Sequence, residues 1–531
     1  MIHRRRSGVG HWIFPAAVGL LLGVAGANAQ KPRNSALLNP ENYRSTFEQF
    51  VADEQEMLGS APELPWNWFV ANIPWLDTPD PEINEIYYFR WYSFQKHIQH
   101  VPDGYLISEF LDPVPWAGRY NAIDMASGEH IREARWLRDP EYVDDYTRFW
   151  FGPDGEPRRY STWAADSVYE VYLATGNENL ATGLLPALEK NYAAWEATHQ
   201  DPNGLFWQID DRDGMEDSIS GTGYRPTINS YMYGDARAIA KIADLARQPD
   251  VAASYRDKAS RLRELIENRL WNPDAHFYET VPRGDQHGWS DVRELIGYIP
   301  WYFDLARADH DEAWSFLFDP QGFAGKYGPT TAERRSPRFR YAVHHECLWN
   351  GPSWPFATTQ TLVALANLLN GPQQPFMTDA DYYRLLKTYA HSQHIRTPQG
   401  HVVPWIDEDL DADTGEWIAR DILTAQHASP PNRGRYYNHS GFADPIITGL
   451  IGLRPAAGNT ITVHPLLPSD QWAYFALDGL PYHGHILTIF YDRDGTRYHR
   501  GRGMHVFCDG TQVAHSAELQ GAVGTLDRCG N

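Results

Sequence analysis

The sequence predicts a mainly α-helical fold, a toroid of paired helices, followed by a small C-terminal antiparallel β module. From about residue 160 to residue 400, apolar residues recur at steps of three and four in segment after segment. Nearly all-apolar segments alternate with amphipathic ones, which suits an inner ring of buried helices wrapped by an outer ring. After about residue 452 the pattern changes to short β-branched and aromatic runs separated by turn signals.

The first predicted pair of helices shows the repeating unit. Residues 161–175 have helical spacing and stop at Gly176, and residues 179–198 carry apolar side chains at steps of four, four and three. These side chains are Leu184, Leu188, Tyr192 and Trp195. Residues 229–246 and 255–270 repeat the pattern, so they are predicted as the next pair.

A further pair is predicted after residue 357. Residues 358–369 are nearly all apolar or small, and residues 370–372 (Asn-Gly-Pro) form a strong helix stop. Thr378 then caps the next helix, with Asp381 at its third position. A buried helix is thus again followed by an amphipathic one.

The C-terminal residues predict strands. Residues 460–463, 483–491 and 505–513 are β-branched and aromatic runs, and Asp509-Gly510 is one of the turn signals among them. The predicted domains are a signal sequence at residues 1–29, a catalytic helical domain with its N-terminal extension at residues 30–455, and the β module at residues 456–531.

The N-terminus predicts export. Arginines at positions 4–6 precede an apolar run over residues 12–24, and the triplet Ala27, Asn28, Ala29 offers a cleavage site. The apolar run is shorter than the roughly 20 residues that cross a bilayer core. We therefore expect a periplasmic or secreted protein that is not inserted in a membrane after signal cleavage.

Charge and cysteines limit the partners. The chain carries a formal net charge of -22 at pH 7, which disfavours binding to nucleic acid or to anionic membranes. Of the three cysteines, Cys508 and Cys529 are close enough in sequence to pair in an oxidising compartment. Unpaired buried thiols are the alternative, and the sequence leaves both open.

Aromatic residues are the informative part of the composition. They make up 14% of the chain, with 20 Trp and 30 Tyr. Their flat faces stack on sugar rings, and their N–H and O–H groups bind hydroxyls. A large aromatic core is the alternative, and composition alone does not separate the two.

Three loop segments carry chemistry-bearing residues. Residues 211–218 hold four carboxylates within seven residues, which raises the pKa of the least solvated one, as a general acid requires. A solvated acidic loop is the competing interpretation. Residues 347–355 place Trp349 and Trp354 around a rigid Gly-Pro bend, and residues 404–417 form a second acidic loop that can supply a base.

At these motifs the sequence resembles the six-hairpin, (α/α)6-barrel glycosidases, in particular the group with processing α-glucosidase, trehalase and mannosylglycerate hydrolase. That group carries its acid in a Gly-Trp/Met-Asp-Asn stretch before a helix that opens with Asn-Ser-Tyr. Residues 214–217 and 229–231 match this arrangement. Glu216 stands where the family has Asp. Asp217, the next residue, is the alternative acid, and we favour Glu216.

The resemblance extends to two further motifs. Residues 349–355 match a Trp-Arg/Asn-Gly-Pro-x-Trp-Pro element that lines the sugar site of the family. The family base is the Glu of a Glu-x-Tyr-Asn-Pro-x-Thr-Gly stretch, and residues 408–415 have the same interval and the same ending. A rival match at residues 435–438 has Arg where the Glu should be, so Glu408 is the predicted base.

The resemblance also implies substrate-binding roles. It implies that Trp349, Trp354 and Trp405 frame the −1 sugar, and that Asn350, Tyr231 and Arg225 bind its hydroxyls. From the predicted first inner helices and their loops, Arg90, Trp116, Asn121 and Arg135 are further candidates for hydroxyls or a carboxylate. Structural salt bridges and core packing explain this last group nearly as well.

The resulting hypothesis is an exo-acting, inverting glycosidase on an oligosaccharide or polysaccharide. Its acid and base carboxyl groups would lie ~6.5–9.5 Å apart, with a water between base and sugar. The hypothesis requires no cofactor. His344, His345 and Glu346 suggest a metal, but adjacent histidines point in different directions, so we expect no metal site. A polysaccharide lyase and a non-catalytic sugar-binding protein are the alternatives, and the sugar stays unassigned.

Overall fold

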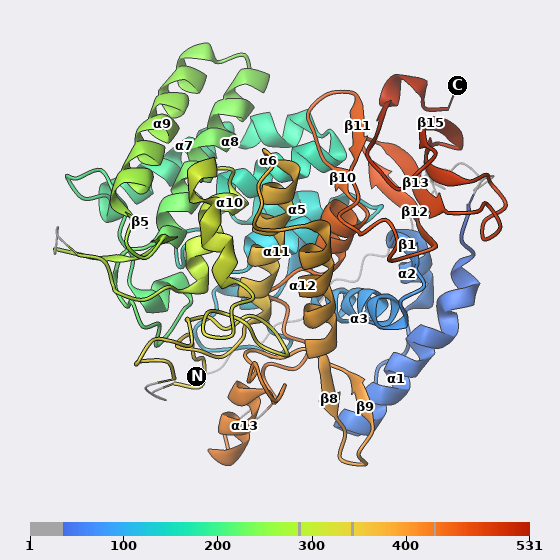
Figure 1. Cartoon of the computed structure of the whole chain (residues 1–531), viewed down its shortest axis with the longest axis horizontal. Coiled ribbons are helices and arrows are strands. Elements are labelled where there is room, and N and C mark those ends of the chain that lie inside the picture. The colour runs from blue at the N-terminus through green and yellow to red at the C-terminus, as the bar shows by residue number, and fades with distance from the viewer. Residues whose placement is uncertain (1–35, 285–287, 341–344, 429–431, 531) are drawn as a thin grey trace, which may run out of the picture. The chain divides into compact units, whose positions relative to one another are not determined.

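The computed structural model describes residues 36–284, 288–340, 345–428 and 432–530 (Figure 1). The predicted signal sequence and His344 lie outside these residues. In the described ranges, no helix combines the length and the hydropathy needed to cross a membrane.

The helices are α1 (Arg44–Leu58), α2 (Trp66–Asn72), α3 (Pro81–His97), α4 (Ser127–Ala134), α5 (Glu141–Phe149), α6 (Ala164–Thr175), α7 (Glu178–His199), α8 (Pro226–Leu245), α9 (Pro249–Arg269), α10 (Ile299–Tyr302), α11 (Pro355–Asn370), α12 (Asp379–Ser392), α13 (Ile418–Ala425) and α14 (Ala443–Pro445), which continues as a π-helix over Ile446–Leu450. The strands are β1 (Trp75–Asp77), β2 (Ile98–Val101), β3 (Gly104–Ile107), β4 (Gly223–Tyr224), β5 (Trp271–Asn272), β6 (Phe277–Tyr278), β7 (Val281–Pro282), β8 (His394–Arg396), β9 (Val402–Pro404), β10 (Leu453–Arg454), β11 (Thr460–Val463), β12 (Tyr474–Tyr482), β13 (His485–Asp492), β14 (Gly503–Cys508), β15 (Thr511–Ser516) and β16 (Ala522–Thr525).

Fully buried helices alternate with half-buried ones. All eight residues of α4 are buried, as are 16 of the 20 in α8 and 13 of the 16 in α11. By contrast, α7 buries 7 of 22 residues, α9 buries 5 of 21 and α12 buries 6 of 14. The second group packs on the first, with α8 between α7 and α9, and α12 against α11. The predicted alternation of buried and amphipathic helices is therefore present.

The predicted helix boundaries are close to the observed ones. α8 and α11 each begin three residues earlier than the apolar pattern predicts, because both open with a proline at the first helical turn. α12 has the predicted cap: the Thr378 side chain and Asp381 form a reciprocal capping box. Fixed starts matter here, because the loops that precede α8 and α11 carry candidate site residues.

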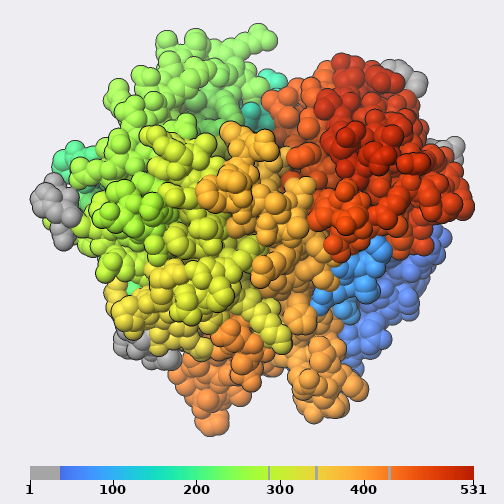
Figure 2. All heavy atoms as spheres, in the orientation of Figure 1, coloured from blue at the N-terminus to red at the C-terminus, as the bar shows by residue number. Residues whose placement is uncertain are grey.

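The C-terminal strands form antiparallel sheets, but not from C-terminal residues alone. One sheet has the order β1-β12-β13-β14-β15, and a second has the order β10-β11-β16. β1 precedes α3 in sequence and pairs with β12, Trp75 opposite Asp478. The Asp478 carboxylate also accepts the backbone N–H groups of Leu37 and Leu38. The N-terminal segment thus adds a strand to the module, and Figure 2 shows blue N-terminal residues directly beside the red C-terminal ones.

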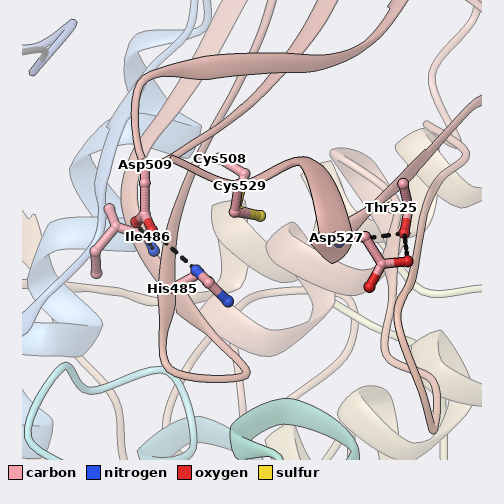
Figure 3. Close-up of a disulfide and its surroundings, with 7 residues drawn as sticks. All are labelled: His485, Ile486, Cys508, Asp509, Thr525, Asp527 and Cys529. Carbon is pink, nitrogen blue, oxygen red and sulfur yellow. Dashed lines mark hydrogen bonds and ion pairs between the residues drawn. A yellow bond between two sulfur atoms is a disulfide. The ribbon is translucent and has the colours of Figure 1, made fainter. Parts of the chain in front are cut away.

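The same β region contains a disulfide. Cys508 and Cys529 are bonded, with Cα atoms 4.9 Å apart and a sequence separation of 21 (Figure 3). This settles the pairing that the sequence left open. Next to it, His485 contacts the Asp509 carboxylate at 2.8 Å, which fixes the β14–β15 turn against β13.

Candidate active site

A cavity of about 250 Å³ lies where the N-terminal ends of three buried helices meet. Met125 precedes α4, Glu216 lies on the loop before α8, and Trp354 is the N-cap of α11. The full lining is Glu109, Phe110, Trp116, Ile123, Met125, Tyr160, Gly214, Glu216, His345, Glu346, Cys347, Trp354, Glu408, Arg433 and Tyr437. Both predicted catalytic glutamates therefore face one space.

The loop that carries Glu216 is held by buried polar contacts. Arg225 donates from Nε to the Asp213 carboxylate at 2.6 Å and from Nη1 to Ser218 Oγ at 3.0 Å. The backbone carbonyl of Glu216 accepts the N–H of Trp349 at 3.0 Å, which ties this loop to the Trp349–Trp354 segment. Two predicted motifs thus position each other.

Glu216 has the electrostatics of a proton donor. Burial, together with Asp211 and Glu408, raises the pKa of Glu216 to about 8. Among the described residues, no other side chain forms a hydrogen bond with its carboxyl group. The group is therefore protonated near neutral pH and free to donate to a bound molecule.

Glu408, in contrast, is held by several side-chain hydrogen bonds. Its Oε1 accepts from Arg433 Nε at 2.8 Å, and its Oε2 accepts from Arg433 Nη2 and from Cys347 Sγ, each at 3.0 Å. Backbone hydrogen bonds in both directions between Ser353 and Leu410 join its loop to the Trp354 segment. A paired arginine and a fixed loop give Glu408 one orientation toward the cavity.

Arg433 occupies the cation position of the site. Its Nη1 lies 2.6 Å from Glu346, in addition to the two bonds to Glu408. Although burial opposes it, this guanidinium lowers the pKa of Glu346. His345, Glu346 and Cys347 bring metal-ligand atoms within 4.8 Å of one another, and Arg433 already contacts the carboxylates of Glu346 and Glu408 there.

The predicted aromatic residues divide into a wall and a support. Trp116 and Trp354 line the cavity, and Arg433 lies 4.9 Å from the centre of the Trp116 ring. Trp349 is only 2% exposed and stacks on Trp354, with ring centres 4.6 Å apart. Trp405 is buried against Tyr436 and Arg420 and does not reach the cavity.

Several predicted polar residues lie outside the cavity because the protein itself uses their hydrogen-bonding groups. Asn121 donates to the carbonyls of Phe110 and Asp112 and accepts the N–H of Val114, so it shapes the loop that carries Trp116. Arg90 donates to Tyr389, Gln393 and Ser440, which links α3 to α12. Tyr231 accepts from Gln360 within the core. Asn350 lies outside the cavity because it is fully buried, and its backbone carbonyl accepts the N–H of Arg340.

The two acid candidates are also separated by position. Glu216 lines the cavity, whereas Asp217 does not. Asp217 adopts a positive φ of 60°, a backbone conformation that is uncommon for residues other than glycine. Arg225, predicted to bind hydroxyls, instead acts on the loop beneath Glu216.

The structure adds site residues that the sequence did not indicate. Glu109 is 3% exposed and accepts from Tyr437 at 2.5 Å, and burial raises its pKa to about 8. Arg433 lies two residues before the Arg435–Asn438 stretch, and Cys347 opens the Trp349 motif. Adjacency to a motif was the available signal for these two; nothing in the sequence marks Glu109.

Two family models match the chain. One, described as a mannosylglycerate hydrolase MGH1-like glycoside hydrolase domain, matches residues 119–440, which include Glu216, Glu408 and Arg433. The other, described as the C-terminal domain of glycosyl hydrolase family 65, matches residues 453–515. The matched ranges correspond to the helical region with the candidate site and to most of the C-terminal strands.

Known proteins resemble the chain over different lengths. A solved structure named sialidase is 41% identical with a TM-score of 0.85, covering 92% of this chain and 45% of that one. A mannosylglycerate hydrolase from Thermus thermophilus, solved with Tris and D-glycerate, is 12% identical with a TM-score of 0.52, covering 68% of this chain and 100% of that one. An uncharacterized protein of Borreliella burgdorferi is 23% identical over 162 residues, which is 30% of this chain and 34% of that protein. The chain thus spans less than half of the sialidase and about a third of the Borreliella protein.

Proposed function

Because the chain belongs to the MGH1-like glycoside hydrolase domain family, we propose that it hydrolyses glycosidic bonds with Glu216 as general acid and Glu408 as general base. The observation that carries the proposal is that two carboxyl groups from separate loops face one cavity in different surroundings. Glu216 is held neutral by burial, and Glu408 is held by an arginine. Paired carboxyl groups of this kind carry out glycoside hydrolysis.

In the proposed reaction Glu216 donates its proton to the leaving oxygen as the bond to the anomeric carbon breaks. Glu408 takes a proton from a water that attacks the opposite face of that carbon, which gives inversion. Arg433 and Cys347 supply three donors to Glu408. Since a carboxylate accepts about four hydrogen bonds, the remaining acceptor position, on Oε1, is the one for the water.

The proposed substrate is the terminal sugar of an oligosaccharide or polysaccharide. A volume of about 250 Å³ is below the roughly 300–1,000 Å³ of pockets for drug-sized ligands, which favours one sugar ring and exo-action. Four carboxyl side chains face the cavity, namely those of Glu109, Glu216, Glu346 and Glu408. The one arginine in the described lining is Arg433. This balance favours a neutral sugar over one that carries a carboxylate.

We also propose the architecture and the location. The alternation of buried and half-buried helices supports a closed (α/α)6 toroid over residues 30–455, with residues 456–531 as the β module that β1 completes. The basic and apolar N-terminal sequence supports a cleaved signal at residues 1–29 and a periplasmic or secreted protein.

A sialidase activity is the second candidate. The solved structure of that name is 41% identical over 92% of this chain, which favours it. Against it, the chain covers 45% of that protein, and Arg433 is already bonded to Glu346 and Glu408. A sialic acid carboxylate would need a free cation at this position, so 4-nitrophenyl-type sialosides and neutral glycosides should be compared directly.

The deciding experiment is a panel of aryl glucosides, mannosides, rhamnosides, arabinofuranosides and sialosides, with proton NMR of the first-formed anomer. We expect release of a neutral sugar with inverted configuration, abolished in Glu408→Gln and retained in the matched control Asp217→Asn. An unsaturated, ultraviolet-absorbing product would instead indicate a lyase. Binding of oligosaccharide with no release by the wild type would indicate a sugar-binding protein.

A further inference from the structure

A second cavity, of about 220 Å³, lies at the other end of the same buried helices. Arg132 and Arg135 come from the end of α4, Arg237 and Lys241 from the second half of α8, and Arg454 from β10. With Asp166, Glu170 and Asp304, the charged lining amounts to five cations and three acids, a formal +2 in a chain of -22. Asp444, behind the lining, reduces this to +1.

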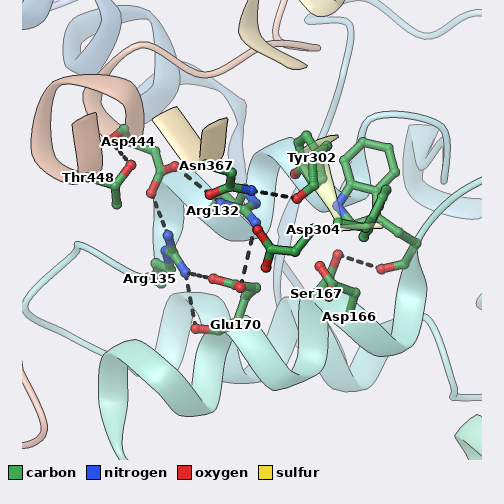
Figure 4. A network of polar contacts seen from close by, with 12 residues as sticks. Arg132, Arg135, Asp166, Ser167, Glu170, Tyr302, Asp304, Asn367, Asp444 and Thr448 are labelled. Carbon is green, nitrogen blue, oxygen red and sulfur yellow. Dashed lines mark hydrogen bonds and ion pairs between the residues drawn. The ribbon is translucent and has the colours of Figure 1, made fainter. Parts of the chain in front are cut away.

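Two of the five cations, Arg132 and Arg135, each pair with two acids, as Figure 4 shows. Arg135 donates to Glu170 and, at 2.7 Å, to Asp444, and Arg132 lies 3.6 Å from a carboxylate oxygen of each of the same acids. Arg135 and Asp444 are each 1% exposed. These four groups form a closed, buried ion network that requires no ligand.

The other three cations have no comparably close pairing with a buried acid, and Asp166, Glu170 and Asp304 act on Lys241 only from farther away. Arg454 donates only to neutral oxygens, Asn367 Oδ1 at 2.8 Å and the Thr448 carbonyl at 3.4 Å. Lys241 lies 4.8 Å from the Tyr169 ring centre, and among the described residues no carboxylate comes within 4 Å of it or of Arg454. Arg237 lies 3.8 Å from Asp304, an acid that is itself 65% exposed.

This clustering is costly for an empty site. Burial lowers the pKa of Lys241 and of Arg454, and the neighbouring Arg237 lowers that of Lys241 further. The lining and Asp444 still leave an excess of one positive charge, and a desolvated cation is unfavourable unless an anion pairs with it closely. The C-terminal carbonyl ends of α8 and α11 offset part of this positive charge. A helix dipole does not, however, accept hydrogen bonds from the individual N–H groups of a guanidinium.

We propose that this cavity binds a doubly charged tetrahedral oxyanion, phosphate or sulfate, through Lys241, Arg237 and Arg454. Three donor groups from α8 and β10 then converge on one anion, as charge-assisted hydrogen bonds favour. Asp166 and Asp304 limit the size of the anion and its affinity, since each repels it. The free ion and an ester-linked group on a saccharide share this chemistry.

The test is thermal unfolding and calorimetric titration of the full chain with inorganic phosphate, sulfate and glucose 6-phosphate, against chloride at equal ionic strength. We expect phosphate or sulfate to raise Tm by about 2 °C near saturation. Lys241→Met should weaken the binding at least about tenfold, as loss of a charge-assisted hydrogen bond implies. Lys190→Met, an exposed lysine on α7, is the matched control.

The outcomes are distinct. Equal affinity in Lys241→Met and wild type, or no effect beyond ionic strength, would overturn the proposal and leave the helix ends and the lining acids as the compensation. Arg237→Gln provides a second test at a half-exposed position, if Lys241→Met unfolds. Glucose 6-phosphate binding tighter than phosphate would assign the ester, and the reverse would assign the free ion.

Discussion

The two cavities at the ends of α4, α8 and α11 use buried charge in opposite ways. At the N-terminal ends, four carboxyl groups face the space, and Glu216 is left without a partner side chain among the described residues. At the C-terminal ends, five cations face the space, and Arg132 and Arg135 are closed into a network with two acids. One end keeps a reactive group available; the other uses Arg132 and Arg135 to hold helices together.

The origin of the residues explains this difference. Glu216, Glu408 and Arg433 come from loops, where a side chain can be aimed without regard to helical period. The second cavity is built from helix positions three and four apart, such as Arg132/Arg135 and Arg237/Lys241. Acids near helix N-termini and cations near C-termini also follow the helix dipole. Function and stability are therefore expected to separate along the helix axes.

The largest expected effect is on the loop-built end. Glu408→Gln should lower kcat/KM by about 10³–10⁴-fold and Glu216→Gln by about 10²–10⁴-fold, because each removes one proton transfer. Both variants should keep the wild-type circular dichroism. Steady-state rates on the best aryl glycoside measure the loss. Lys241→Met, at the other end, should stay within about twofold of wild type, and a comparable loss there would break the comparison.

The next effect is on stability at the helix-built end. Arg135→Met should reduce the free energy of unfolding by about 3–5 kcal/mol, because it leaves buried Asp444 short of its donor. Urea unfolding gives the change, with Lys190→Met as the exposed control. Activity of the folded fraction should be unchanged. A variant of normal stability but low kcat would show that the two ends are coupled.

The pH profile should sharpen the assignment of the acid. Glu216 acts only when protonated, and its pKa of about 8 predicts that kcat/KM falls up to tenfold per unit as pH rises above about 8. Below that pH the acid stays protonated, so it causes no loss on that side. With an activated leaving group that needs no acid, Glu216→Gln should lose this alkaline limb.

Glu109 provides the control for that profile, since its pKa is also raised to about 8 in the same cavity. Glu109→Gln should keep the alkaline limb. A limb that persists in Glu216→Gln and disappears in Glu109→Gln would transfer the acid role to Glu109.

Sequence patterns were informative where periodicity or motif order fixes structure. Apolar spacing located α6, α7, α8, α11 and α12 within a few residues, and it located α9 except for a start six residues earlier. The two acidic loops and the tryptophan motif predicted Glu216, Glu408 and Trp354 as site residues, and all three line one cavity. β1 escaped prediction because three residues carry no readable alternation. Its partner strand, β12, is about 400 residues away.

Loop contacts were the part that the sequence could not supply. Arg433 reaches Glu408 from 25 residues away, and Glu109 reaches Tyr437 across 328 residues, so no local spacing records either pair. Arg225, Asn121 and Arg90 were expected to bind sugar, but their donors satisfy backbone and side-chain groups inside the protein. Buried polar groups require hydrogen-bond partners, and a sequence does not show whether a given side chain bonds to the protein or to a ligand.

The smallest effect concerns Cys347, whose thiol donates to Glu408 Oε2 beside Arg433. Burial and the neighbouring Glu408 raise the pKa of this thiol well above its usual range, so it remains a neutral donor that holds the carboxylate without adding charge. Cys347→Ala should lower kcat about 2–10-fold with little change in KM, the effect of one weak hydrogen bond. Cys347→Ser, which keeps a donor, should restore most of the rate. A change confined to KM would instead indicate that the thiol contacts the sugar directly rather than holding Glu408.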